Sequence, residues 1–202
     1  DILEKADDFD VAVHDLIKQY LTEHQRIIFN GNGYSDEWVA EAERRGLPNI
    51  KSMIEAAGTL TTPKAVALFE KFHIFTKTEL ESREEIIYET YAKTINIEAL
   101  TMIDMAGKQI VPAVVKYSKS LADTVNAVKT AGVDASVQVE LLKEVSGKLT
   151  KIQTALEALK KAEKEAAAIE DAKQQAFFYK DTVKEIMAQL RQPADELEMI
   201  VD

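Results

Sequence analysis

The sequence predicts a mainly α-helical protein with a helical domain, a projecting antiparallel helix bundle and at most one short strand. Apolar residues recur three and four positions apart through most of the 202 residues, which is the period of an amphipathic helix. No proline lies between Pro112 and Pro193, so that stretch is free to form long helices. With 46% hydrophobic and 30% charged residues, the composition is that of a globular protein rather than a disordered chain.

The first expected helix follows Asp7 or Asp8, either of which suits a helix cap. Its apolar residues keep helical spacing: Phe9, Val13, Leu16, Ile17, Tyr20 and Leu21. Residues 26–29 (Arg-Ile-Ile-Phe) are the one short strand that the sequence suggests. Asn30–Gly33 predicts a turn, because asparagine and glycine both tolerate a positive φ.

Two short helices are expected next. Ser35 suits the cap of the first, and acidic residues directly after it complement the helix dipole. Gly46 is expected to end this helix, and Pro48 prevents its continuation. The second helix is expected over residues 52–57.

The following helices carry clear start signals. Thr62–Pro63 combines a cap with a proline at the first helical position, for a helix that runs to about Phe72. Thr76–Glu79 has the pattern of a capping box, and a long helix follows it. We expect Gly107 and Pro112 to interrupt or kink that long helix.

The back half of the chain contains two apolar series at spacings of three and four, one residue out of phase with each other. The first is Leu142, Val145, Leu149, Ile152, Leu156 and Leu159, and the second is Ile169, Ala172, Ala176, Tyr179, Val183, Ile186 and Leu190. The offset indicates either a turn near Ala162–Ala168 or a stutter in one long helix. A single helix of roughly 58 residues would be about 87 Å long and would need a partner for its apolar stripe, so we favour a hairpin.

Charge and aromatic content divide the chain. Residues 1–107 have a net charge of −9 and ten aromatic residues, whereas residues 108–202 have a net charge of −1 and four. We therefore expect a helical region over residues 1–107, a long-helix bundle over 108–192 and a C-terminal tail over 193–202.

Composition argues against several classes of function. A net charge of −10 repels phosphate, so we expect no nucleic-acid partner and no membrane partner. Cysteine is absent, which rules out disulfides and thiolate metal sites, and no apolar run is long enough to span a bilayer. The chain starts at Asp1 without a signal peptide, so we expect a cytoplasmic piece of a longer protein, or else a trimmed whole domain.

The Asn30–Gly33 loop is the most tempting candidate for a binding site. A phosphate-binding loop needs the pattern GxxxxGK[ST] or GxGxxG, and the sequence FNGNGYSDEW lacks both the lysine and the third glycine. Asp36 and Glu37 would also face the phosphate. We interpret this loop as a structural turn.

The remaining candidate residues also favour structural roles. His14, His24 and His73 form no pair with metal-site spacing, so we interpret them as packing or surface residues. Five glutamates follow a helix face that we expect to be solvated: Glu79, Glu81, Glu84, Glu85 and Glu89. The sequence therefore assigns no catalytic, cofactor-binding or metal-binding residue.

Three segments resemble the C-terminal region of type III glutamine synthetases. They are EHQRIIFNGNGYSDEWVAEAERRGLPN (23–49), KFHIFTKTELESREEIIYETYAKTINIEALTM (71–102) and QAFFYKDTVKEIMAQLRQPADELEMIVD (175–202). The segment before residue 23 is similar to the helix that follows the catalytic core in that family. Residues 118–170 match by helical character alone.

The resemblance implies a parent enzyme that joins ammonia to the γ-carboxyl group of glutamate through a γ-glutamyl phosphate, using ATP and Mg²⁺ or Mn²⁺. The family's metal-binding and phosphate-binding residues lie upstream of the matching segments, so no ligand residue is carried over to this chain. It implies a non-catalytic, inactive region that packs on the catalytic domain of the same chain. It also implies a role in architecture, regulation or contacts within a homo-oligomer, because members of the family form large rings.

Two alternatives remain at this point. The chain could be a free-standing helical scaffold or adaptor that binds a partner helix through its apolar stripes. It could also be a regulatory module that binds a small molecule at the Gly31–Gly33 loop.

Overall fold

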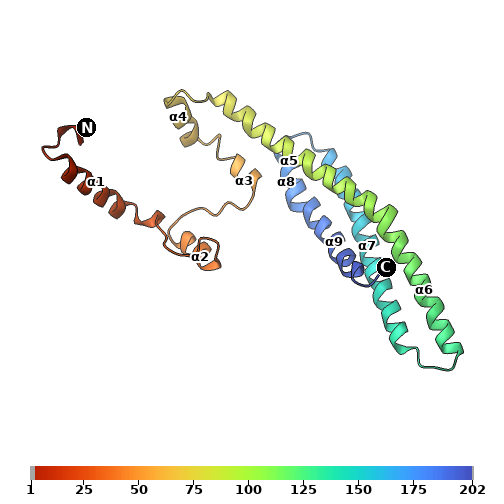
Figure 1. The fold of residues 1–202 in the computed structure, drawn as a ribbon. Helices are drawn as coiled ribbons and strands as arrows, with labels where there is room; N and C mark the ends of the chain where they lie inside the picture. The colour runs from red at the N-terminus through yellow and green to blue at the C-terminus, as the bar shows by residue number, and fades with distance from the viewer. Residues whose placement is uncertain (1–2, 202) are drawn as a thin grey trace. The chain divides into compact units, whose positions relative to one another are not determined.

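The computed structural model describes residues 3–201, and all of its regular structure is helical (Figure 1). The chain separates into two compact units, Asp1–Ser52 and Met53–Asp202, which we call the N-terminal unit and the bundle unit. The mainly α fold is therefore confirmed. The boundary expected near Gly107 lies inside the bundle unit, within a continuous run of helix.

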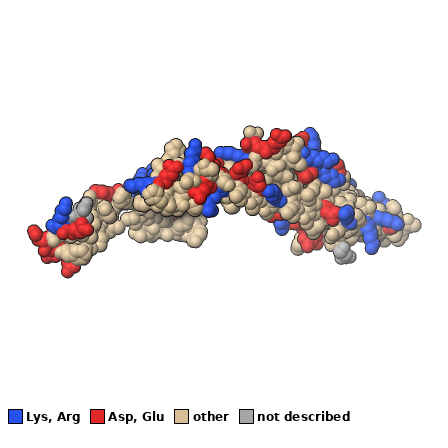
Figure 2. All heavy atoms as spheres, turned by 90° about the horizontal axis from the view of Figure 1, so that it is seen from above, with Lys and Arg blue, Asp and Glu red and all other residues tan. Residues whose placement is uncertain are grey.

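The N-terminal unit contains a 3₁₀ turn (Leu3–Lys5), helix α1 (Phe9–Glu23), a second 3₁₀ turn (Gln25–Ile27) and helix α2 (Asp36–Arg44). Asp8 caps α1, because its Oδ1 accepts a hydrogen bond from the Val11 N–H at 3.1 Å. Acidic side chains gather at the end of the chain that holds α1 (Figure 2).

Helix α2 begins and ends where the sequence predicts. The Ser35 Oγ accepts a hydrogen bond from the Trp38 N–H at 3.3 Å. Gly46 adopts a φ of 74°, and the Leu47 N–H turns back to the Ala42 carbonyl at 2.9 Å, which closes the helix end.

The predicted strand over residues 26–29 is wrong. Gln25–Ile27 forms a 3₁₀ turn and Ile28 alone is extended, and no strand occurs anywhere in the described residues 3–201. A strand needs a neighbouring strand to satisfy its main-chain groups. Here the carbonyl groups of Gln25, Arg26 and Ile28 accept hydrogen bonds from the Arg45 side chain instead.

The bundle unit begins with α3 (Met53–Ala57) and α4 (Pro63–Lys71). The Thr62 cap and Pro63 start α4 as predicted, and both hydrogen bonds of the Thr76–Glu79 capping box are present. These contacts fix the start of α5 (Lys77–Met105), which is the first long helix of the bundle.

Gly107 and Pro112 do not end the helix that contains them. A π-helical turn, η3 (Ala106–Ile110), joins α5 directly to α6 (Val111–Thr130). Such a turn holds one extra residue within a continuing helix and changes the phase of its apolar stripe. Proline is accommodated because it lies at the start of α6.

The back half forms the favoured hairpin rather than one long helix with a stutter. Helix α7 (Ser136–Ala167) is followed by its cap residue Ala168, and Asp171 caps α8 (Ala172–Phe178) by accepting a hydrogen bond from the Gln174 N–H at 2.8 Å. The turn therefore lies just beyond the expected Ala162–Ala168 region. A second π-helical turn, η4 (Tyr179–Val183), leads into α9 (Lys184–Glu198).

Residues 193–202, assigned to a tail from the sequence, include the last turns of α9. The helix continues through Pro193, and both Pro193 and Leu197 are buried. Packing of this apolar face compensates for the main-chain hydrogen bond that proline cannot donate.

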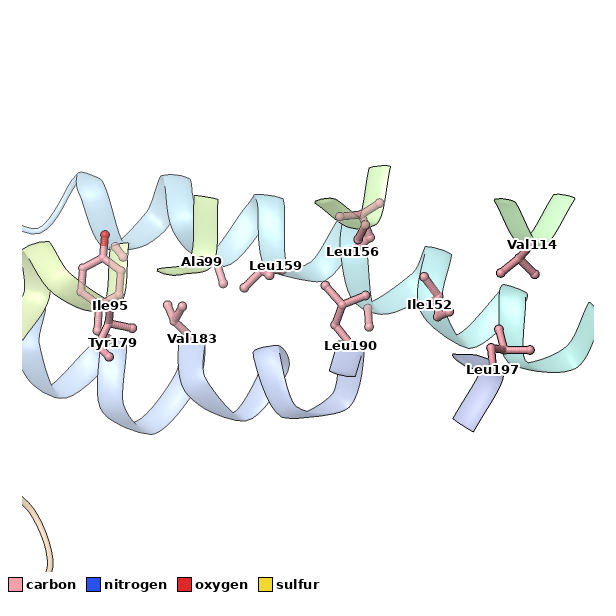
Figure 3. Packing of buried hydrophobic residues seen from close by; sticks show 14 of the residues in the cluster. Ile95, Ala99, Val114, Ile152, Leu156, Leu159, Tyr179, Val183, Leu190 and Leu197 are labelled. Atoms are coloured by element: carbon pink, nitrogen blue, oxygen red, sulfur yellow. The ribbon is translucent and has the colours of Figure 1, made fainter. Parts of the chain in front are cut away.

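The core of the bundle unit runs between three lengths of helix: α5 with α6, α7, and α8 with α9 (Figure 3). Helix α7 runs antiparallel to the other two (Figure 1). Ala99 of α5, Leu159 of α7 and Val183 of η4 are fully buried in it. A smaller cluster joins Ile54 and Ala57 of α3 to Tyr88 of α5 and Ala176 of α8. Burial of these apolar stripes is the main stabilising contribution to the bundle.

Candidate interaction surfaces

Helix α1 presents an apolar stripe that the N-terminal unit leaves uncovered. Phe9 is 60% exposed, Tyr20 is 54% exposed, and Ile17 and Leu21 are also exposed, while Leu16 is half-buried. None of the residues of α1 is buried. An amphipathic helix with an exposed apolar face is typical of a surface that contacts another protein segment.

Arg45 holds the connection between α1 and α2. Its guanidinium group donates hydrogen bonds to the Gln25, Arg26 and Ile28 carbonyls and to Glu41 Oε1, the last at 2.5 Å. The same group lies about as far from the Phe29 ring as from the Trp38 ring, at 6.0 and 5.8 Å. The two rings stack with their centroids 4.2 Å apart.

No pattern in the sequence indicates this role of Arg45. Arg44 and Arg45 are adjacent and chemically alike, but the Arg45 side chain is 19% exposed and that of Arg44 is 71% exposed. Hydrogen bonds from both guanidinium groups, first from Arg44 and then from Arg45, lower the pKa of Glu41 to about 2.

The Asn30–Gly33 loop lies next to this cluster. The hydrogen-bonded turn covers Asn32–Ser35, two residues beyond the predicted one, and neither Gly31 nor Gly33 adopts a positive φ. Asn32 Oδ1 accepts a hydrogen bond from the Tyr34 N–H at 3.0 Å, and the Asn32 carbonyl accepts one from the Ser35 hydroxyl at 3.0 Å. Phe29 packs against Gly31, since a Cβ atom built on Gly31 would lie 2.5 Å from Phe29 Cζ. The loop therefore leads directly into α2 and leaves Tyr34 exposed.

The three histidines lie apart from one another. His14 is exposed and its Nδ1 lies 3.2 Å from Asp15 Oδ1. His24 follows the end of α1 beside the Tyr20 ring. His73 follows α4 with a φ of 53°, a left-handed conformation that ends that helix. Each of these surroundings is consistent with a structural role.

Four of the five glutamates at the start of α5 lie on a solvated face, as predicted. Glu79 completes the capping box, Glu81 pairs with Lys77 at 3.4 Å, Glu89 pairs with Lys93 at 2.7 Å, and Glu85 is exposed. These pairs follow one helix surface and do not converge on a common point.

Glu84 is the exception, and the expectation that it is solvated is wrong. Its side chain is only 12% exposed and accepts hydrogen bonds from the Thr61 hydroxyl at 2.5 Å and the Tyr88 hydroxyl at 2.8 Å. Burial raises the pKa of Glu84, but these bonds and nearby Lys173 lower it overall. Burial, together with Glu84, raises the pKa of Tyr88. Glu84 therefore ties the segment before α4 and the start of α8 to α5.

A shallow apolar groove of about 200 Å³ lies beside the π-helical turn η3. Met102, Met105 and Ile110 line one side of it, and Leu190 and Ala194 of α9 line the other. The Arg191–Asp195 ion pair, at 3.0 Å, lies at its edge. This groove suits an apolar contact rather than acid–base chemistry.

The free end of the α6–α7 hairpin combines a narrow buried seam with exposed apolar residues. Leu121, Val125 and Val145 form the seam, whereas Val133 and Val137 near the connecting loop are exposed. Gln138 Oε1 is buried and, within residues 3–201, has no hydrogen-bond partner.

In residues 3–201, no group of three or more His, Cys, Asp or Glu residues is placed to hold a metal ion. None of the helices in the same range combines the length and the apolar character needed to cross a bilayer.

Comparison with known proteins identifies the family. Residues 12–129 match the glutamine synthetase C-terminal domain family. The chain is 36% identical over 198 residues to a glutamine synthetase of Butyrivibrio fibrisolvens and 32% identical over 207 residues to one of Bacteroides fragilis (strain YCH46). These alignments cover 97% and 100% of this chain, and the second therefore includes the segment 175–202 that lies outside the family match.

A third relative, the type-3 glutamine synthetase of Dictyostelium discoideum, is 39% identical over 117 residues, or 58% of this chain. The chain spans 28% of the length of each of the two bacterial relatives. The resemblance that the sequence motifs indicate is confirmed, and this chain belongs to the glutamine synthetase C-terminal domain family.

Proposed function

We propose that this chain is a non-catalytic structural region of a glutamine synthetase, which packs on the catalytic part of the enzyme and supports assembly of its subunits. The exposed apolar stripe of α1 carries the proposal. Apolar area of this kind gains stability when another surface covers it. The catalytic part of the same chain is the proposed cover.

The reaction belongs to the remainder of the enzyme in this proposal. Ligation of ammonia to glutamate with ATP requires carboxylates that converge on a metal ion and cations that converge on phosphate. The charged groups described here pair along helix surfaces, as Lys93 and Glu89 do. ATP and Mg²⁺ or Mn²⁺ would therefore bind residues outside this region.

The α1 stripe can be tested in the full-length enzyme that carries this region. We expect the double substitution Phe9→Ser and Tyr20→Ser to weaken packing on the catalytic part, because both side chains lose apolar area that the interface buries. Sedimentation velocity should show partial dissociation of the assembly, with reduced glutamine synthesis. Lys18→Ser, on the opposite side of α1, is the matched control. Unchanged assembly in the double variant would count against the proposal.

The contribution of the α6–α7 hairpin to assembly needs a separate test. Deleting residues 118–124 together with residues 142–148 removes one heptad from each helix, and the two heptads lie at similar distances from the loop between the helices. The shortened hairpin should keep its apolar register. We expect a smaller assembly in sedimentation, and an assembly of unchanged size would exclude a role for the hairpin.

The non-catalytic role predicts the behaviour of the isolated 202-residue chain. We expect no ATP consumption above background when glutamate, ammonia and Mg²⁺ are supplied. Measurable phosphate release that depends on both glutamate and ammonia would overturn the proposal.

A further inference from the structure

The loop between residues 28 and 35 contains two Asn-Gly pairs, Asn30–Gly31 and Asn32–Gly33, and both asparagines are exposed. We propose that Asn30 is a site of spontaneous deamidation and that the fold of the loop protects Asn32. This inference concerns covalent chemistry of the loop and does not depend on the proposed role in assembly.

The reaction needs only the chain and water. The main-chain nitrogen of Gly31 attacks the side-chain Cγ of Asn30, and the bond from Cγ to the amide nitrogen breaks. Ammonia leaves with the proton that Gly31 gives up, and a five-membered succinimide remains. Water then opens either of its two carbonyl groups, giving aspartate or isoaspartate at position 30. A following glycine favours the attack because it has no side chain to hinder the main chain.

Asn30 is free to reach the attacking geometry. Among the described residues 3–201, its side chain makes no hydrogen bond and it lies outside regular structure. The position after it accepts only glycine without a shift, since a Cβ on Gly31 would meet the Phe29 ring at 2.5 Å. The packing of Phe29 therefore disfavours any residue other than glycine at position 31, and a glycine after Asn30 is what makes Asn30 reactive.

Asn32 has the same sequence context but is restrained. Its Oδ1 accepts the Tyr34 N–H at 3.0 Å, and its carbonyl accepts both the Ser35 hydroxyl and the Ser35 N–H, at 3.0 and 3.3 Å. The attack on its Cγ requires rotation of the side chain and of the main chain, which opens these bonds. Loss of hydrogen bonds of ordinary strength slows the reaction by about tenfold or more relative to Asn30.

Deamidation would change the structure next to the loop. Isoaspartate adds one carbon atom to the main chain directly after Phe29, and the Phe29 ring stacks on Trp38. The new carboxylate also lies next to the segment whose carbonyl groups bind Arg45. Trp38 is the only tryptophan in the sequence, so tryptophan fluorescence reports on the surroundings of this one side chain.

The test is incubation of the 202-residue chain at mildly alkaline pH, followed by tryptic peptide mapping. Trypsin releases residues 27–44 as one peptide that contains both asparagines, and tandem mass spectrometry locates the mass gain from replacing NH₂ by OH. We expect the gain at Asn30, with ammonia released in equal amount, isoaspartate detected by isoaspartyl methyltransferase labelling, and a matching change in Trp38 fluorescence.

Two variants make the assignment specific. Asn30→Gln should abolish both the mass gain and the fluorescence change, since closure of the larger ring is slow, whereas Asn32→Gln should leave both unchanged. Absence of a mass gain at Asn30, or an equal or faster gain at Asn32, would overturn the proposal. Accumulation of isoaspartate without a change in Trp38 fluorescence would overturn its structural consequence.

Discussion

Arg45 shows how one side chain can organise a unit that has almost no core. It binds three main-chain carbonyls that lie 17 to 20 residues before it, and it contacts both aromatic rings of the stack. Lysine cannot replace the planar, multiply donating guanidinium group in such a position. The N-terminal unit therefore depends on Arg45 more than on any apolar residue of α1.

The first prediction compares the two adjacent arginines. Arg45→Met should destabilise the N-terminal unit by about 1–3 kcal/mol, because several hydrogen bonds from a charged donor are lost. Arg44→Met should have a much smaller effect, since its side chain is 71% exposed. Urea unfolding followed by Trp38 fluorescence measures both. Equal effects of the two variants would contradict the assigned role of Arg45.

The second prediction concerns acid. The folded-state pKa of Glu41 is lowered from 4.5 to about 2 by hydrogen bonds from Arg44 and Arg45. A carboxyl group with a lowered pKa stabilises the folded state above its unfolded-state pKa, and this contribution disappears as the pH falls from about 4.5 to about 2. Glu41→Gln should flatten the pH dependence of Trp38 unfolding in this window. The same slope in both proteins would contradict the pairing.

At the scale of the element, glycine residues in the bundle unit have opposite roles. Gly147 lies inside α7 with open space where a Cβ would be, whereas Gly132 follows α6 with a φ of 77°. We expect Gly147→Ala to stabilise the bundle by about 0.5–1 kcal/mol through helix propensity. We expect Gly132→Ala to destabilise it by about 1–2 kcal/mol, because alanine is strained at positive φ. Thermal unfolding followed by circular dichroism measures both, and effects of the same sign would contradict the opposite roles of the two glycines.

A further prediction tests the apolar core of the bundle unit. Ile152 is fully buried between α7 and its neighbours, and Ile97 of α5 is 67% exposed. Ile152→Ala should cost about 2–5 kcal/mol, because it removes buried methyl groups and leaves a cavity. Ile97→Ala should change the free energy of unfolding by less than about 0.5 kcal/mol. Similar losses of unfolding free energy at the two positions would contradict the burial of Ile152 in the core.

Local signals in the sequence predicted most helix boundaries. Caps at Ser35, Thr62 and Thr76 and the stop at Gly46 depend on hydrogen bonds within a few residues, so they are visible in the sequence. The phase offset between two apolar series left a turn and a stutter open, and the need of one long apolar stripe for a partner favoured the hairpin. Signals of this kind locate elements without information about their neighbours.

Features that depend on distant partners were missed. Ile27 and Ile28 are both β-branched, but the Ile28 carbonyl binds Arg45, which lies 17 residues away. Glu84 looks like its neighbouring glutamates until Thr61 and Tyr88 are placed beside it. The π-helical turns follow from matching the stripes of three helices, which no local pattern specifies.

At the scale of the whole molecule, the two units differ in how they are stabilised. Among the described residues, Ala42 is the one buried apolar residue of the N-terminal unit, while the bundle unit contains both buried clusters. Stability increases with buried apolar area, so the N-terminal unit should be the weaker. The exposed apolar stripe of α1 agrees with this difference, because its side chains gain no burial within the N-terminal unit.

The last prediction follows from this difference. In urea, Trp38 fluorescence should change at a lower midpoint than far-UV circular dichroism, because Trp38 lies in the N-terminal unit and most helical residues lie in the bundle unit. Ile152→Ala should lower the midpoint of the circular dichroism transition and leave the Trp38 transition in place, since sites in separate cooperative units contribute independently. Coincident transitions that move together in the variant would show one cooperative unit. In that case the N-terminal unit would draw its stability from the bundle, and the α1 stripe would not need the catalytic part as its cover.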